Sequence, residues 1–137
     1  MKLRFFIYGL LGWTMEIFWT GLGSLLRGDV RLQGVSYLWM FPIYGLAVLM
    51  EPLHDRMKHV NWFWRGGLWI LVIFALEALT GSMIKYLTGI IPWDYSADTR
   101  YDVAGLIRLD YAPVWFLVGL AFEKMHDFLR TKVLIRK

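Results

Sequence analysis

The sequence predicts an all-α membrane protein, a bundle of four transmembrane helices with both termini in the cytoplasm. Hydrophobic residues make up 58% of the 137 residues and aromatic residues 18%, above the apolar share of ordinary globular domains. Four apolar segments are long enough to cross a bilayer, and Lys and Arg residues flank them unequally. Because this length is typical of one domain, we expect a single transmembrane domain over residues 1–137.

The four predicted spans cover residues 5–26, 34–53, 66–87 and 107–129. A helix of about 22 residues is about 33 Å long, which matches a hydrocarbon core of about 30 Å. Pro42 leaves two interpretations of the second span. It either kinks a helix that begins near Leu32 or lies in the first turn of a later helix. In the second case residues 35–40 would form a short interfacial or re-entrant piece.

The positions of the basic residues predict the orientation. With four spans, both termini and the second loop share one side of the membrane. That side would hold ten basic residues, namely Lys2, Arg4, Arg56, Lys58, Arg65, Lys124, Arg130, Lys132, Arg136 and Lys137. The opposite side would hold five, namely Arg27, Arg31, Lys85, Arg100 and Arg108. The positive-inside rule then places both termini in the cytoplasm, in a multi-pass protein of the cell inner membrane. The basic tail is expected to contact anionic lipid headgroups rather than nucleic acid.

Two carboxylates are the sharpest candidates for function. Glu16 and Glu77 are each the twelfth residue of a predicted span, and both spans run in the same direction. A charged side chain at the bilayer centre costs about 2.5–3.5 kcal/mol on insertion scales, so each must face protein or water. Gly9, Gly12 and Thr20 lie on the same side of the first helix as Glu16, where small residues permit close packing. The glutamates are expected to bind a cation or exchange a proton. The alternative is a structural role in helix packing.

Aromatic residues on the other spans could complete such a site. Tyr44 lies on the second span, and Trp13 and Trp115 lie deeper in the membrane than most tryptophans of the chain. They are candidates for an aromatic cage around a cation or an acyl chain. The other tryptophans considered are expected in the interfacial belt, namely Trp39, Trp62, Trp64 and Trp93.

The loop over residues 88–106 is the longest predicted connection and lies outside. Four charged residues, Asp94, Arg100, Arg108 and Asp110, could clasp a zwitterionic headgroup, although such mixed charges more often form solvated ion pairs. The chain has no cysteine, and its three histidines show no metal-ligand spacing. It also has no Walker A loop and no G-x-S-x-G motif. We therefore expect no metal, no cofactor and no enzymatic activity.

Several stretches, in order along nearly the whole chain, resemble the bacterial membrane family described as putative ABC-transporter type IV. They are Leu11-Gly12-Trp13 with Glu16, Pro42-Ile43-Tyr44-Gly45, Glu77 with Thr80-Gly81, Trp93-Asp94-Tyr95-Ser96, residues 105–109, and Trp115 with Gly119. One departure is Ala104, which stands where the family pattern carries asparagine before a glycine. The resemblance implies a multi-helix membrane protein connected with transport. Another chain would have to supply any ATPase activity.

The leading functional hypothesis is a small transport or ligand-binding membrane protein, forming a homo-oligomer in contact with membrane lipids. Its intramembrane cavity would be lined by Glu16, Tyr44, Glu77 and Trp115. The alternative is a non-catalytic accessory or lipid-binding scaffold subunit, in which the glutamates fix helix packing. A lipid-modifying enzyme with Glu16 and Glu77 as acid and base is the third hypothesis, and no recognisable nucleophile supports it.

Overall fold

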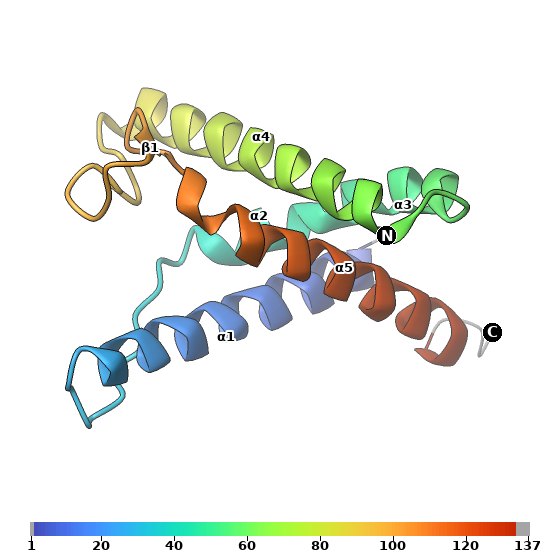
Figure 1. Cartoon of the computed structure of the whole chain (residues 1–137), viewed down its shortest axis with the longest axis horizontal. Helices are drawn as coiled ribbons and strands as arrows, with labels where there is room; N and C mark the ends of the chain where they lie inside the picture. Colours follow the sequence, from blue (N-terminus) through green and yellow to red (C-terminus); the bar gives the residue numbers. More distant parts are fainter. Residues whose placement is uncertain (1, 134–137) are drawn as a thin grey trace. The chain divides into compact units, whose positions relative to one another are not determined.

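The computed structural model describes residues 2–133, with side chains through Thr131. Residue contacts divide the chain into two compact units, Met1–Pro52 and Leu53–Lys137, and each is described by itself. Helices dominate both units (Figure 1), which confirms the all-α class. From the predicted basic tail, the side chains of Lys132, Arg136 and Lys137 lie outside the described part. The single domain over residues 1–137 stays a prediction.

The first unit is built on one long apolar helix, α1 (Lys2–Leu26). It begins three residues before the predicted span and ends at the predicted residue. Gly28, with φ of 89°, follows the helix, and its N–H donates to Leu25 O at 2.8 Å while Asp29 N–H donates to Ser24 O at 3.0 Å. This is the Schellman pattern that satisfies the last carbonyls of a helix.

The second predicted span is corrected at its start. Residues 33–37 are not helical, and the helical run consists of α2 (Met40–Gly45), a 3₁₀ segment η1 (Leu46–Met50) and α3 (Glu51–Met57). Pro42 lies in the first turn of α2, where its fixed φ suits a helix and its missing N–H costs nothing. The second interpretation of Pro42 is therefore the one that the structure supports. In Figure 1 the non-helical segment leads from the end of α1 back to α2.

The second unit pairs two helices. The longer one, α4 (Trp62–Thr88), extends the predicted span of residues 66–87 at both ends. The side chain of Asn61 accepts a hydrogen bond from Phe63 N–H at 2.9 Å and caps the start. Gly89, with φ of 74°, donates its N–H to Lys85 O and ends the helix. Both residues are of the types preferred at these positions.

The fourth predicted span is also corrected at its start, because a small hairpin occupies residues that we expected to be helical. Strand β1 (Asp102–Val103) pairs antiparallel with β2 (Ile107–Arg108). A 3₁₀ turn η2 (Leu109–Tyr111) leads to α5 (Ala112–Phe128), which has a proline in its first turn and continues into a π-helical turn η3 (Leu129–Val133).

Positive φ angles make the hairpin turn. Ala104 and Gly105 have φ of 54° and 72°, and Leu106 N–H donates to Val103 O at 3.0 Å. Two successive residues with positive φ are the signature of a type I′ turn, for which Asn-Gly is the preferred sequence. Ala104 therefore adopts a conformation that asparagine tolerates better than alanine.

Close packing of α4 on α5 depends on glycine. A Cβ atom at Gly119 would lie 2.2 Å from Cβ of Trp69, a side chain with no exposed surface. A Cβ at Gly66 would lie 2.2 Å from the ring of Phe116. Small residues at helix crossings allow the two backbones to approach. The α4–α5 pair is therefore held by tight packing around Trp69.

One helix in the described part of the chain, α4, is long and apolar enough to cross a membrane by length and composition. Helix α5 has 17 residues, and the second helical run is broken into short pieces. Four spans with cytoplasmic termini stay a prediction.

A matched glycine pair tests this packing. We expect Gly119→Ala to lower the free energy of unfolding by about 1–3 kcal/mol, the usual cost of overpacking, because the new methyl group meets Cβ of Trp69. Gly67→Ala is the control, since a Cβ there meets nothing within 4 Å and alanine favours helix by up to about 1 kcal/mol. Denaturant unfolding of both variants in mild detergent checks the pair. Equal free energies of unfolding for Gly119→Ala and Gly67→Ala would show that α4 and α5 do not pack tightly at Gly119.

Candidate functional site

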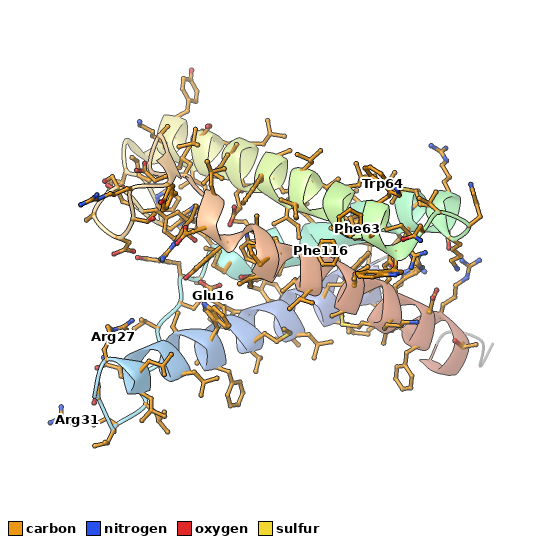
Figure 2. The ribbon with its side chains drawn as sticks, in the orientation of Figure 1. Glu16, Arg27, Arg31, Phe63, Trp64 and Phe116 are labelled. Carbon is orange, nitrogen blue, oxygen red and sulfur yellow. The ribbon has the colours of Figure 1, made fainter. Side chains whose placement is uncertain are left out.

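Glu16 lies on α1 at the centre of the first unit's polar contacts. The hydroxyl groups of Tyr44 and Ser36 hydrogen-bond to its carboxyl group. The second carboxyl oxygen, Oε2, is buried and has no hydrogen-bond partner among the described residues. Figure 2 shows where Glu16 projects from α1. A buried carboxylate oxygen without a partner is costly, so this oxygen is an acceptor available to a ligand or a proton.

Glycines bring Tyr44 to this carboxylate. A Cβ atom at Gly12 would lie 2.4 Å from the Tyr44 ring, and one at Gly9 would lie 2.7 Å from Phe41 O. On α2, a Cβ at Gly45 would lie 2.6 Å from the ring of Phe5. The predicted small-residue side of α1 therefore packs directly on α2.

The non-helical segment is bound to α1 by similar close contacts. A Cβ atom at Gly34 would lie 2.4 Å from Ile17 O. The hydroxyl of Thr20 accepts a hydrogen bond from Val35 N–H at 2.9 Å, and its one proton is shared among Val35 O at 2.9 Å and the helix carbonyls Glu16 O and Ile17 O at 3.0 and 3.1 Å. Outside helices and sheets, backbone groups at membrane depth need such partners. Thr20 supplies them one turn beyond Glu16, and so it fixes the segment that carries Ser36.

Trp13 also lies in the first unit. Its ring packs edge-on against Phe41, with 6.4 Å between ring centroids. Its indole Nε1 is buried without a hydrogen-bond partner among the described residues. Trp13 and Glu16 are three residues apart on α1, so they lie on neighbouring positions of the helix surface. The first unit thus gathers a carboxylate oxygen and an indole N–H, both buried and both unpartnered within the described part of the chain.

Two further predicted residues belong to the second unit. Glu77 lies in the middle of α4 and is half-buried. Trp115 lies on α5, and its ring packs edge-on against Tyr111 at 6.1 Å between centroids. The structure therefore groups Glu16, Tyr44 and Trp13, while a cavity shared with Glu77 and Trp115 stays a prediction.

The candidate residues predicted to lie outside the membrane are found in and around the hairpin of the second unit. They are Trp93, Asp94, Tyr95, Arg108 and Asp110. Trp93 is 4% exposed and donates Nε1–H to Leu106 O at 3.0 Å, so its side chain packs within the protein, and its place in the interfacial belt stays a prediction. This hydrogen bond and the packing against Gly81 explain its burial. Tyr95 donates its backbone N–H to Gly105 O. Asp94 accepts from Ser96 N–H at 2.9 Å, and hydrogen bonds from Ser96 lower the pKa of the Asp94 carboxyl group.

The charges of Arg108 and Asp110 neutralise each other. Arg108 and Asp110 form a two-pronged ion pair, with Nε 3.0 Å from Oδ1 and Nη2 3.0 Å from Oδ2. The Arg108 guanidinium also lies over the Tyr111 ring, 4.4 Å from its centroid. Tyr111 in turn contacts the ring of Tyr95. These contacts agree with the ion-pair alternative rather than with an open clasp for a headgroup.

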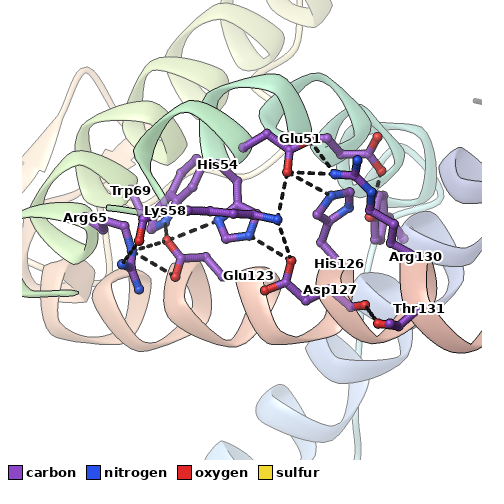
Figure 3. Close-up of polar contacts among 12 residues, drawn as sticks. Glu51, His54, Lys58, Arg65, Trp69, Glu123, His126, Asp127, Arg130 and Thr131 are labelled. Atoms are coloured by element: carbon purple, nitrogen blue, oxygen red, sulfur yellow. Dashed lines mark hydrogen bonds and ion pairs between the residues drawn. The ribbon is translucent and has the colours of Figure 1, made fainter. Parts of the chain in front are cut away.

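A polar cluster of the second unit was not predicted. It joins the end of α3, the start of α4 and the end of α5 (Figure 3). His54 and Glu123 are its buried members, and Lys58 and Asp127 are more exposed. A hydrogen bond from Lys58, 3.0 Å away, lowers the pKa of Asp55. The same bond raises the pKa of Lys58, with a further contribution from Asp127.

Only part of this cluster was visible in the sequence. Glu123, His126 and Asp127 lie at helical spacings of three and four residues, which place them near one another on α5. That spacing could have indicated a polar helix face. The described residues include no group of His, Asp and Glu arranged to hold a metal ion.

The Thr20 hydroxyl provides a test of how the segment around Ser36 is held. We expect Thr20→Val to lower the free energy of unfolding by about 1–3 kcal/mol, because Val35 N–H and C=O lose their partner. Thr20→Ser keeps the hydroxyl and should cost much less. Thermal unfolding in detergent measures both. A Thr20→Val variant as stable as Thr20→Ser would contradict the assigned role.

Comparison with known proteins identifies the family to which the chain belongs. No solved structure matches the chain. The family described as putative ABC-transporter type IV matches residues 3–136, and its description agrees with a membrane location and a connection with transport. The match covers both units and every candidate residue described above. The chain therefore belongs to the putative ABC-transporter type IV family.

Proposed function

We propose that this protein is a small integral membrane protein that binds or transports a small molecule at Glu16. The observation that carries the proposal is the buried Oε2 of Glu16, which has no hydrogen-bond partner among the described residues. A carboxylate in that position takes a cation, a hydrogen-bond donor or a proton. Family membership supports a connection with transport.

The construction around Glu16 supports this proposal. Broken helices expose backbone and side-chain polar groups at membrane depth, and many transporter sites are built from them. The non-helical residues 33–37 beside α1 form such a break. Tyr44 and Ser36 already hold one side of the carboxyl group, which would orient it toward a ligand. Trp13 would add an aromatic face and an indole N–H donor.

The proposed function is non-catalytic. If the protein works with an ATPase, a separate subunit supplies it, since the chain has no P-loop sequence. We also propose that the protein forms a homo-oligomer in the cell inner membrane. Oligomerisation would cover apolar side chains that one chain exposes, among them Phe18 and Trp19 of α1.

A second candidate function is a lipid-binding scaffold. An apolar groove of about 560 Å³ runs between α4 and α5, and Figure 2 labels three of its residues, Phe63, Trp64 and Phe116. A Cβ atom at Gly67, which also lines the groove, would meet nothing within 4 Å. An apolar groove at the side of a membrane helix pair fits an acyl chain.

Native mass spectrometry of mildly extracted protein tests the proposal. We expect the parent to retain a bound small molecule that Glu16→Gln loses, with occupancy lower by at least about tenfold, because a charge-assisted hydrogen bond contributes about 1.5–3 kcal/mol. Met15→Leu, on the exposed side of the same helix, is the control and should keep the ligand. Equal occupancy in parent and Glu16→Gln would contradict the proposal.

Two further variants separate the alternatives. Loss of the same ligand in Glu77→Gln would indicate that both carboxylates serve one site. Gly67→Leu fills the α4–α5 groove and leaves the residues of the Glu16 site unchanged. If Gly67→Leu loses bound lipid while Glu16→Gln changes nothing, the scaffold function is the correct one.

A further inference from the structure

The polar cluster of the second unit contains a histidine placed between two carboxylates. His54, on α3, is 3% exposed. Its Nε2 lies 3.2 Å from Asp127 Oδ1, and its Nδ1 lies 3.5 Å from Glu123 Oε1. Both contacts are drawn in Figure 3. One ring nitrogen of His54 therefore faces each carboxylate.

The two carboxylates differ in access to solvent. The side chain of Asp127 is 47% exposed, and that of Glu123 is 4% exposed. Glu123 Oε1 accepts hydrogen bonds from Trp69 Nε1 at 2.8 Å and Arg65 Nε at 2.9 Å. The His54 ring thus separates a solvent-facing acceptor from a buried one.

The surrounding charges balance when His54 and His126 are both neutral. Three carboxylates, those of Asp55, Glu123 and Asp127, face three permanent cations. The cations are Lys58 after α3, Arg65 on α4 and Arg130 after α5. His126, on α5, lies with Nε2 4.0 Å from Asp55 Oδ1, and its ring contacts that of His54 edge-on. A proton added to His54 would therefore be the excess charge of the cluster, and it would face two carboxylates.

The buried Nδ1 of His54 has no hydrogen bond within the described part of the chain. A distance of 3.5 Å to Glu123 Oε1 exceeds a normal N–H···O bond, although a small movement of either side chain would close it. Imidazole can gain a proton at one nitrogen and release another from the opposite nitrogen. Here the solvent-facing carboxylate of Asp127 lies at one nitrogen of the ring, and the buried carboxylate of Glu123 lies at the other.

We propose that His54 is a proton-transfer site between the solvent-facing Asp127 and the buried Glu123. In the tautomer of His54 that carries its proton on Nδ1, a proton arriving through Asp127 forms the N–H bond at Nε2. The N–H bond at Nδ1 breaks, and that proton binds Oε1 of Glu123. The ring returns to neutrality in its other tautomer, and Glu123 becomes the neutral acid while Trp69 and Arg65 still donate to it. The reverse step restores the starting state. This site is separate from Glu16, and the proposal does not depend on the ligand proposed there.

Nitrogen-15 NMR of histidine-labelled full-length protein in detergent tests the proton-binding part. We expect both neutral tautomers of His54, with the proton on Nδ1 or on Nε2, to be populated and to exchange, because a carboxylate faces each ring nitrogen. Asp127→Asn should lower the ratio of the Nε2–H tautomer to the Nδ1–H tautomer by about tenfold, because the Nε2–H group loses its charged acceptor. Asp127→Glu should restore the ratio. His59, exposed after α3, is the internal control and should respond equally in all variants. A His54 ring that stays in one tautomer in the parent and in both Asp127 variants overturns the proposal.

Infrared spectroscopy after a rapid pH drop tests the transfer itself. The C=O band of protonated Glu123 is identified by its absence in Glu123→Gln. We expect this band to appear at least about tenfold more slowly in His54→Gln than in the parent. In a purely structural ion-pair cluster, replacing His54 would not change the rate at which Glu123 is protonated. Equal rates in parent and His54→Gln, with both proteins folded by size-exclusion chromatography, would overturn the relay.

Discussion

The first unit depends on one constraint, which is that the backbone of residues 32–35 lies directly on the backbone of α1. Gly34 permits the contact because any Cβ there would meet Ile17 O at 2.4 Å. Thr20 stabilises it by satisfying both backbone groups of Val35. With the segment fixed in this way, the chain turns back at α2 and brings Ser36 and Tyr44 to the Glu16 carboxyl group. The candidate site depends on this contact for the position of Ser36, and on the packing of Gly9 and Gly12 against α2 for the position of Tyr44.

Sequence reasoning predicted the parts of this arrangement that follow from helical periodicity. The spacing of Gly9, Gly12, Glu16 and Thr20 placed them on one side of the first helix, and that side packs on the second segment. The start of the second helix was predicted wrongly because apolar composition does not distinguish an extended segment from a helix. The start of the fourth was wrong because the hairpin turn relies on Ala104 at positive φ, a conformation that alanine rarely adopts.

The polar cluster around His54 could not be predicted for a different reason. Its contacts join residues far apart in sequence, 73 positions in the case of His54 and Asp127. Periodicity places residues on a helix face, but it does not say which face of another helix comes opposite.

The cluster and the Glu16 site also differ in chemistry. One balances its charges internally, whereas the other has a buried oxygen with no partner among the described residues.

A ligand that binds Glu16 needs a path to the segment beside it, and thiol labelling of Ser36→Cys tests whether that path exists. The chain has no native cysteine, so a single introduced thiol gives an unambiguous signal. We expect a charged, water-soluble thiol reagent to label Ser36→Cys in membranes, while Met15→Cys on the exposed side of α1 stays unlabelled. A folded Ser36→Cys protein that the reagent does not label, although a membrane-permeant reagent does, would contradict it.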